Sequence, residues 1–273
     1  MNEIKVLELF GGIGAIRKAF ERQNIPFKVV DYVEIDKYAV ASYNAIFNEH
    51  FEPQNICDWD KDIEVDFIMH GSPCQDFSVA GINQGGNEGT GTRSSLMWET
   101  VRIVKKLKPK YILWENVKNV IGKKHKHNFD KYINTLNELG YKSYYEVLNA
   151  KDYGIPQNRE RVFTLSIKND VDNVFLFPQK EELKVKLKDM LENDVDEKYY
   201  LSNDIINKIT LSLSGNTFVI KNNTKKGYLI AEHGDGVYTQ PSTTKRGMVQ
   251  KGIIQTITQR QNVGVVVDER FKN

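Results

Sequence analysis

Cys74 is the residue in this sequence best placed to act as a nucleophile. It lies in Gly71-Ser72-Pro73-Cys74-Gln75-Asp76-Phe77-Ser78, directly after the apolar run at 65–70. The run is typical of a buried strand, and the Gly-Ser-Pro turn ends it. In open α/β folds, a cysteine at the carboxyl edge of the sheet lies where ligands bind. A thiolate there could attack an electrophilic carbon, and a buried, unreactive thiol is the alternative interpretation.

An acid in one later apolar run and two arginines just before another could also take part in chemistry. Glu115 lies within the strand-like run 111–117, where burying a carboxylate is costly unless it is paired or used. In a closed pocket it would favour holding a proton and could donate it to a substrate. Arg159 and Arg161 precede another apolar run. Their guanidinium groups could bind a carboxylate or a heterocycle's carbonyl oxygen, and a surface ion-pair network is the alternative.

A glycine turn near the amino terminus predicts that the backbone approaches a ligand closely. Gly11-Gly12-Ile13-Gly14 follows the strand-like run 4–10 and precedes a helix-like segment. This order matches the first half of a nucleotide-binding βαβ unit, although the full GxGxxG pattern is absent. Glu34 follows Gly14 by twenty residues, the distance at which an acid accepts hydrogen bonds from a ribose. Together they favour an adenosine-containing ligand; a plain turn and a solvated carboxylate are the alternatives.

Strands and helices must alternate to position these residues. Strand-like runs at 27–33, 144–148 and 162–167 join those above, and helical spacing of apolar residues marks 96–104 and 129–139. This alternation of strands and helices predicts an α/β fold of the doubly wound kind. Residues 80–95 are rich in Gly, Asn, Thr and Ser, which is typical of a mobile active-site loop or, alternatively, of a disordered surface loop.

The alternation of strand-like and helix-like segments ends near residue 172, so we expect two domains, 1–172 and 173–273. Short β-prone pieces in the second part are separated by turn residues and predict a smaller, mostly β and irregular region. Residues 203–273 hold ten Lys/Arg against five Asp/Glu, or +5, and the rest of the chain holds 28 against 31, or −3. This excess of positive charge suggests that the last quarter meets an anionic partner.

Composition restricts the class of protein further. A chain of 273 residues can bury a sizeable core. Its net charge of +2 does not by itself indicate a binding partner. Two cysteines and no apolar leader predict a reducing, cytoplasmic setting. No apolar run approaches the ~20 residues of a membrane span, so no membrane association is expected. His125 and His127 lack partners at metal-binding spacing, so no metal is expected.

Five motifs, taken in order, closely resemble those of the bacterial cytosine-5 DNA methyltransferases. They are Phe10-Gly11-Gly12-Ile13-Gly14, Glu34, Pro73-Cys74-Gln75, Glu115-Asn116-Val117 and Gln157-Asn158-Arg159-Glu160-Arg161. The resemblance covers residues 4 to about 168 clearly and the rest in outline. It implies a Rossmann-like methyltransferase core followed by a target-recognition region. It also implies S-adenosylmethionine as methyl donor and double-stranded DNA as substrate, in a restriction-modification or phage system.

The resemblance also implies catalytic roles. The Cys74 thiolate would add to carbon 6 of a cytosine flipped out of the duplex. Glu115 would act at ring nitrogen 3 and the exocyclic amine, while Arg161, counted with Arg159 among the catalytic residues, would hold the carbonyl oxygen. Carbon 5 would then attack the sulfonium methyl group. Loss of the carbon-5 proton and elimination of Cys74 would restore the ring.

Donor contacts are implied in the same way. They would come from Phe10, Gly11, Gly12, Ile13, Gly14, Glu34, Ile35, Asn55, Ile56, Asp58, Pro73 and Leu96. At one of these sites the family favours Asp-Ile, whereas this chain has Asn55-Ile56 with Asp58 close by. Whether Asn55 or Asp58 accepts a hydrogen bond from the adenine amine therefore stays open.

The family's closing motifs give rise to the remaining hypotheses. Family members continue past the recognition region with Arg-Lys-Leu, Pro-Glu-Cys, Gly-Phe/Tyr-Pro and Gly-Asn-Ser segments, and this sequence reaches Asn273 without them. A fragment, a split enzyme completed by a second polypeptide, and a catalytically silent DNA-binding remnant are the explanations considered. A nicotinamide-dependent oxidoreductase would rest on the glycine turn and Glu34 alone, and the Cys74 and Glu115 motifs oppose it.

Overall fold

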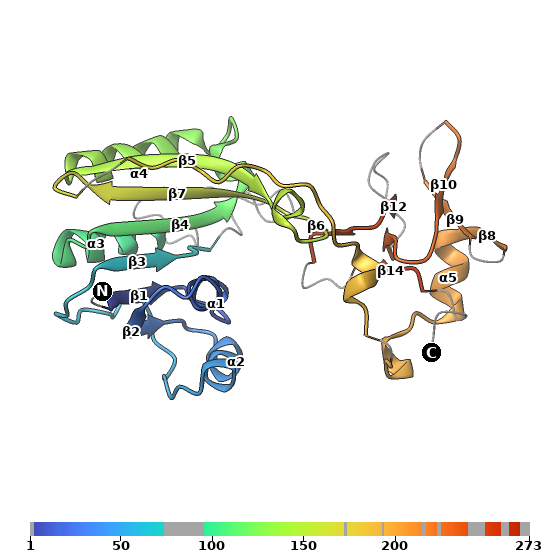
Figure 1. Ribbon diagram of the computed structural model, residues 1–273, viewed down its shortest axis with the longest axis horizontal. Helices are drawn as coiled ribbons and strands as arrows, with labels where there is room; N and C mark the ends of the chain where they lie inside the picture. Colours follow the sequence, from blue (N-terminus) through green and yellow to red (C-terminus); the bar gives the residue numbers. More distant parts are fainter. Residues whose placement is uncertain are drawn as a thin grey trace. The chain divides into compact units, whose positions relative to one another are not determined.

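The computed structural model describes residues 3–73, 96–171, 174–192, 194–214, 217–222, 225–239, 249–257 and 262–267. Cys74 and the loop expected at 80–95 lie outside the described residues. The chain forms two compact units (Figure 1). Unit 1 contains Met1–Leu148 and Arg161–Phe177, and unit 2 contains Asn149–Glu160 and Pro178–Asn273.

Unit 1 is built on a six-stranded sheet with the order β2-β1-β3-β4-β7-β5 (Figure 1). Its strands are β1 (Ile4–Leu9), β2 (Phe27–Val33), β3 (Phe67–His70), β4 (Tyr111–Val117), β5 (Tyr141–Asn149) and β7 (Glu160–Lys168). Strands β2, β1, β3 and β4 pair in parallel, and β7 runs antiparallel to β4. This mixed sheet confirms the predicted α/β, Rossmann-like core.

Helices pack on both faces of this sheet because its strands alternate their side chains. The helices are α1 (Ala15–Arg22), α2 (Lys37–Phe47), α3 (Met97–Leu107) and α4 (Lys126–Glu138). Ile112 and Trp114 of β4 are buried in the main core together with apolar residues of α3 and α4. Phe67 and Tyr111 stack on the opposite side, where Phe20 of α1 packs edge-on against Phe67.

Unit 2 has small sheets and a separate core. Its longer elements are α5 (Asn203–Ile209), β8 (Thr210–Ser214), β9 (Thr217–Lys221), β10 (Tyr228–Ala231), β11 (Gly236–Tyr238) and β14 (Val263–Val265); β6 (Gln157–Asn158), β12 (Val249–Gln250) and β13 (Ile254–Gln255) are two residues each. The orders are β10-β9-β8, β12-β11-β14 and β13-β6. Ile220, Ala231, Val237 and Val266 form the buried core. The predicted mostly β and irregular character is confirmed.

The division at residue 172 stays a prediction, and the compact units differ from it in detail. The turn between β5 and β7 belongs to unit 2. The reason is a set of long-range bonds within unit 2: Ile254 N donates to the Pro156 carbonyl at 2.9 Å, and Thr256 Oγ1 donates to the Asn158 carbonyl at 2.8 Å. No local pattern in 149–160 signals this pairing.

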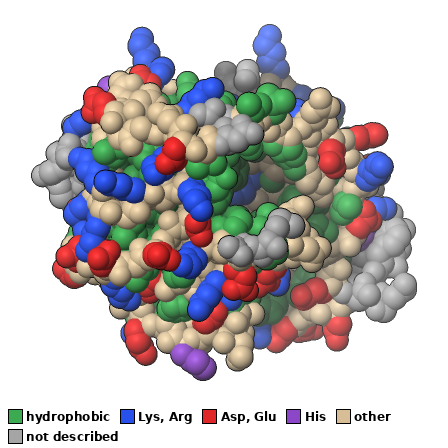
Figure 2. Space-filling model, turned by 60° about the vertical axis from the view of Figure 1, so that its left-hand side comes forward, with side chains coloured by type: hydrophobic (Ala, Val, Ile, Leu, Met, Phe, Trp, Pro, Cys, Tyr) green, Lys and Arg blue, Asp and Glu red, His purple; other side chains and the backbone are tan. Residues whose placement is uncertain are grey.

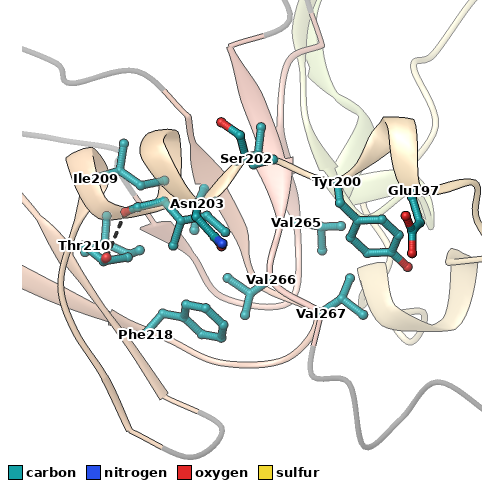
Figure 3. Close-up of a pocket in the computed structure, with 14 residues that line it drawn as sticks. Glu197, Tyr200, Ser202, Asn203, Ile209, Thr210, Phe218, Val265, Val266 and Val267 are labelled. Atoms are coloured by element: carbon teal, nitrogen blue, oxygen red, sulfur yellow. Dashed lines mark hydrogen bonds between the residues drawn. The ribbon is translucent and has the colours of Figure 1, made fainter.

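Unit 2 also contains an apolar cavity of about 700 Å³ beside α5 (Figure 3). Phe218, Val265 and Val266 line it, with Asn203 and Glu197 among the polar residues at its wall. None of the predicted site residues lines this cavity.

Neither a membrane-spanning helix nor a cluster of metal-binding side chains occurs in the described part of the chain. Within those residues, no helix is both long enough and apolar enough to cross a lipid bilayer. The same residues contain no group of three or more His, Cys, Asp or Glu side chains arranged to hold a metal ion.

Candidate active site

The carboxyl ends of four parallel strands bring the predicted site residues into one row. Val33 of β2 lies beside Leu9 of β1, and Leu9 lies beside His70 of β3. His70 in turn lies beside Trp114 of β4. The next residues on these strands are Glu34, Phe10, Gly71 and Glu115. Motifs that are far apart in the sequence therefore meet at the edge where open α/β sheets bind ligands.

Gly71 lies between Phe10 and Glu115 in this row. A Cβ atom added at Gly71 would lie 3.8 Å from the Phe10 carbonyl oxygen and 4.0 Å from Oε2 of Glu115. Gly71 N also donates to the Leu9 carbonyl oxygen at 3.4 Å. The strand that leads toward Cys74 thus ends close to both the start of the glycine turn and the acid on β4.

Glu115 is paired with Arg161 across the antiparallel strands β4 and β7. Nε of Arg161 lies 3.0 Å from Oε1 of Glu115, and the two side chains are 17% and 25% exposed, respectively. The carboxylate is therefore partly shielded but open to a substrate. Arg159 belongs to unit 2, where its N–H donates to Oδ1 of Asn149 at 3.0 Å.

Ser72 anchors the turn before Pro73 to β4. Nε1 of Trp114 donates to Ser72 Oγ at 3.0 Å, and Nδ2 of Asn116 donates to the Ser72 carbonyl oxygen at 3.2 Å. All three residues are buried. Because side chains alternate along β4, Trp114 and Asn116 hold the turn from the face opposite Glu115. Neither Ser72 nor Trp114 stands out in the sequence, because their pairing depends on strand register.

His70 is a buried histidine at the end of β3. Its Nε2 lies 2.9 Å from the Tyr132 hydroxyl, and its ring stacks nearly parallel to that of Trp114 at 5.7 Å. Burial lowers the pKa of His70 to about 3. The ring is therefore neutral at physiological pH and supports the strand end rather than exchanging protons with a substrate.

The glycine turn is tightly folded. Phe10, Gly12 and Gly14 have φ angles of 53°, 53° and 82°, in the left-handed region that favours glycine. Gly14 N donates to the Gly11 carbonyl oxygen at 2.9 Å and closes the turn. A Cβ atom at Gly12 would have no neighbour within 4 Å. The backbone at Gly12 therefore faces open space into which a ligand could fit.

Glu34, the residue after β2, binds the main chain of this turn. Its Oε2 accepts from Gly12 N at 3.1 Å, and its Oε1 accepts from Asp36 N at 2.9 Å. A carboxylate has about four acceptor positions, so Glu34 retains capacity for a ribose hydroxyl. Ile13 and Ile35 are 57% and 68% exposed beside it. An acceptor, an open backbone and exposed apolar side chains fit a ligand that combines a ribose with an aromatic base.

The remaining predicted donor residues differ in exposure. Asn55 and Asp58 are exposed and bonded to each other, with Asn55 Nδ2 donating to Asp58 Oδ2 at 3.0 Å. Ile56 is buried in the main core, so its main chain rather than its side chain could meet a ligand. Pro73 and Leu96 are partly buried, and Leu96 packs against that core at the start of α3.

Glu8 is a buried carboxylate beneath the glycine turn that the sequence analysis missed. It is 2% exposed, and the Tyr43 hydroxyl donates to its Oε1 at 2.7 Å. Arg17 donates to the Tyr43 oxygen and to Glu49, both at 2.8 Å. Burial raises the pKa of Glu8 to about 7, while the Tyr43 hydrogen bond and the Arg17 charge oppose the rise.

We expect Glu8 to make the stability of the protein depend on pH. The folded state keeps the Glu8 proton up to about pH 7, whereas the unfolded carboxyl group, with a pKa of 4.5, loses it earlier. The folded state therefore binds more protons in this window, and the free energy of unfolding falls as pH rises through it. The shift corresponds to roughly 3 kcal/mol. Above about pH 7 this contribution is constant.

Urea denaturation of wild type and Glu8→Gln at several pH values measures this effect. Glutamine resembles the protonated acid in shape and does not ionise. The free energy of unfolding of the variant, relative to wild type, should therefore increase by up to roughly 3 kcal/mol between about pH 4.5 and 7. A difference that stays constant over this range would contradict the raised pKa.

Comparison with known proteins identifies relatives over most of the chain. A sequence profile described as C-5 cytosine-specific DNA methylase matches residues 4–270. The chain is 37% identical over 256 residues to Type II methyltransferase M2.ScrFI of Lactococcus lactis subsp. cremoris, covering 74% of this chain and 71% of that protein. It is 34% identical over 247 residues to Orphan methyltransferase M.SPRI of Bacillus phage SPR, covering 78% and 56%, respectively. The chain thus spans little more than half the length of the phage relative.

The fold also has solved counterparts. The crystal structure of a mutant form of DNMT2 from Spodoptera frugiperda is similar, with a TM-score of 0.64 and 25% sequence identity. The similarity covers 76% of this chain and 66% of that one.

Proposed function

Since the chain belongs to the C-5 cytosine-specific DNA methylase family, we propose that it transfers a methyl group from S-adenosylmethionine to carbon 5 of cytosine in double-stranded DNA. The row of Glu34, Phe10, Gly71 and Glu115 at one sheet edge is the observation that carries this proposal. It brings a turn suited to an adenosine-containing ligand next to an acid suited to act on a base. One edge of the sheet could therefore hold donor and cytosine side by side.

When bound, S-adenosylmethionine supplies an electrophilic methyl group on its sulfonium sulfur. We assign the ribose to Glu34, whose carboxylate retains acceptor capacity while it caps Gly12. The exposed side chains of Ile13 and Ile35 would contact the adenine. The other proposed donor contacts are Phe10, Gly11, Gly14, Asn55, Ile56, Asp58, Pro73 and Leu96. The proposed reaction needs this donor and no metal ion, because a thiolate and an acid activate the base.

Carbon 5 of cytosine is a poor nucleophile until the ring is activated. In the proposed reaction, the Cys74 thiolate forms a bond to carbon 6 and converts the ring into an enamine. Glu115 stabilises this addition by sharing a proton with ring nitrogen 3, so electron density accumulates at carbon 5. Carbon 5 then takes the methyl group, and the bond from that group to the sulfonium sulfur breaks, leaving the neutral thioether S-adenosylhomocysteine. Loss of the carbon-5 proton to a base then expels the thiolate. The base must first leave the duplex, which costs a few kcal/mol of unstacking.

Arg161 is proposed to serve both the acid and the base. Its Nε is directed at Oε1 of Glu115, and a guanidinium group can bind more than one acceptor because its five N–H donors form a fixed fork. Binding of the cytosine carbonyl oxygen by Arg161 would place ring nitrogen 3 near Glu115. Arg159, two residues earlier, is proposed to assist in holding the base.

We assign target recognition to unit 2. The charge feature that supports DNA binding by this unit is the +5 excess of residues 203–273. On the face of the molecule drawn in Figure 2, Lys and Arg side chains are interspersed with Asp and Glu. A polyanion such as DNA is attracted to an excess of positive charge, and this attraction weakens with salt.

Covalent trapping tests the proposed reaction directly. Duplex DNA containing 5-fluorocytosine should form a denaturant-stable complex with the protein when S-adenosylmethionine is present, because fluorine blocks the final proton loss. Unmodified DNA should be methylated and released. DNA binding without trapping or methylation would contradict the proposal and indicate a catalytically silent binding protein.

A further inference from the structure

The glycine turn lies directly on aromatic side chains that the proposed reaction does not use. A Cβ atom added at Gly11 would lie 2.6 Å from Cε2 of the Tyr32 ring, closer than real Cβ contacts allow. A Cβ atom at Gly14 would overlap the Phe47 ring and lie 2.9 Å from Cε2 of Tyr43. The backbone of the turn therefore follows the surface of these rings, and a displaced ring would displace the turn.

Tyr32 also holds the turn by a hydrogen bond. Its hydroxyl donates to the Gly12 carbonyl oxygen at 2.6 Å. The Gly12 N–H donates to Glu34 at 3.1 Å, so both polar groups of Gly12 are bonded to side chains of one segment. Tyr32 lies in β2 and Glu34 directly follows that strand. Their spacing of two residues directs both side chains to the same side of an extended chain.

The Tyr32 ring is itself fixed. It is fully buried and stacks on Tyr43 with ring centroids 3.9 Å apart. Tyr43 is held by its bonds to Glu8 and Arg17, and the Arg17 guanidinium lies 4.3 Å from the centre of the Phe47 ring. The Tyr32 hydroxyl therefore has little freedom to follow a misplaced turn.

We propose that Tyr32 is a positioning residue for the methyl donor. Its hydroxyl holds the main chain at Gly12 in the orientation that keeps the Glu34 carboxylate directed at the ribose. Tyr32 is buried and acts only through Gly12 and Glu34. This inference rests on the proposed function, since it assumes that the turn and Glu34 bind S-adenosylmethionine.

Tyr32→Phe tests the proposal because it removes the hydroxyl and keeps the packed ring. We expect the dissociation constants for S-adenosylmethionine and S-adenosylhomocysteine to rise about three- to tenfold, the range expected for one hydrogen bond. The KM for the donor should rise equally, whereas kcat at saturating donor and the affinity for DNA should stay at wild-type values. Calorimetric titration and steady-state kinetics measure these quantities.

Tyr141→Phe is the matched control. The Tyr141 hydroxyl is a buried donor to the Pro109 carbonyl oxygen at 2.8 Å, and Tyr141 lies on β5, at the opposite edge of the sheet from β2. Tyr141→Phe should lower the melting temperature of the protein as much as Tyr32→Phe does. Its affinity for the methyl donor should stay at the wild-type value.

Three outcomes are distinguishable in this experiment. Selective loss of donor affinity in Tyr32→Phe supports the positioning role. Wild-type donor affinity in Tyr32→Phe, or equal losses in both variants, would overturn it and leave only a structural role for the hydroxyl. Absence of donor binding by the wild-type protein would contradict the proposed function itself.

Discussion

Cys74→Ser should abolish methyl transfer and covalent trapping on 5-fluorocytosine DNA while the protein stays folded. A serine hydroxyl remains protonated near neutral pH, whereas a thiol can ionise and is the better nucleophile. We expect the methylation rate to fall by more than about a thousandfold, equivalent to raising the activation barrier by about 4 kcal/mol. Single-turnover transfer of a radiolabelled methyl group to DNA measures this loss.

Cys57→Ser is the matched control for this substitution. Cys57 is the exposed free cysteine of the described residues, and the proposal gives it no part in the reaction. Its replacement should leave methylation and trapping at wild-type levels. If Cys74→Ser instead retained a rate within tenfold of wild type, Cys74 would not be the nucleophile.

Glu115→Gln should slow methyl transfer by a factor of about 100 or more, the contribution expected of a positioned proton donor. Glutamine preserves the size of the side chain but cannot hold and release the proton at ring nitrogen 3. It also removes the charge that pairs with Arg161 at 3.0 Å. Binding of DNA and of S-adenosylmethionine should persist. Single-turnover rates measured from about pH 6 to pH 9 distinguish the chemical step from binding.

Glu160→Gln serves as the control for a lost acid near the same arginine. Glu160 is exposed, adjoins Arg161 in the sequence, and has no role in the proposed chemistry. The Glu160→Gln variant should methylate DNA at the wild-type rate. A near-normal, pH-independent rate in Glu115→Gln would show that Glu115 is structural.

Much of the fold follows from local patterns in the sequence. Short apolar runs predict β1, β2, β4 and β7 to within a few residues. Such runs must be buried, and their lengths are typical of single strands. The order of the Phe10, Cys74 and Glu115 motifs is sufficient to predict the C-5 cytosine-specific DNA methylase family, whose sequence profile matches residues 4–270. These features depend on neighbouring residues, or on motif order along one chain, and can therefore be read without coordinates.

The tertiary structure decided which of these residues meet. The row at the sheet edge depends on strand order and register, which bring Phe10, Gly71 and Glu115 together across about a hundred residues. The same pairing joins Ser72 to Trp114, and the turn between β5 and β7 to the distant strand β13. No local pattern predicts these bonds, because the two partners in each are far apart in the sequence.

Burial decided the properties of two groups that look ordinary in the sequence. Glu8 is one of 36 acidic residues, and its pKa rises to about 7 because the packed protein excludes water from it. Tyr32 reads as one more apolar residue in a strand, yet its hydroxyl reaches the Gly12 carbonyl oxygen twenty positions earlier. Residue type establishes which hydrogen bonds and charges are available to a side chain. The solvent exclusion and the partner that determine their effect arise only when the chain is folded.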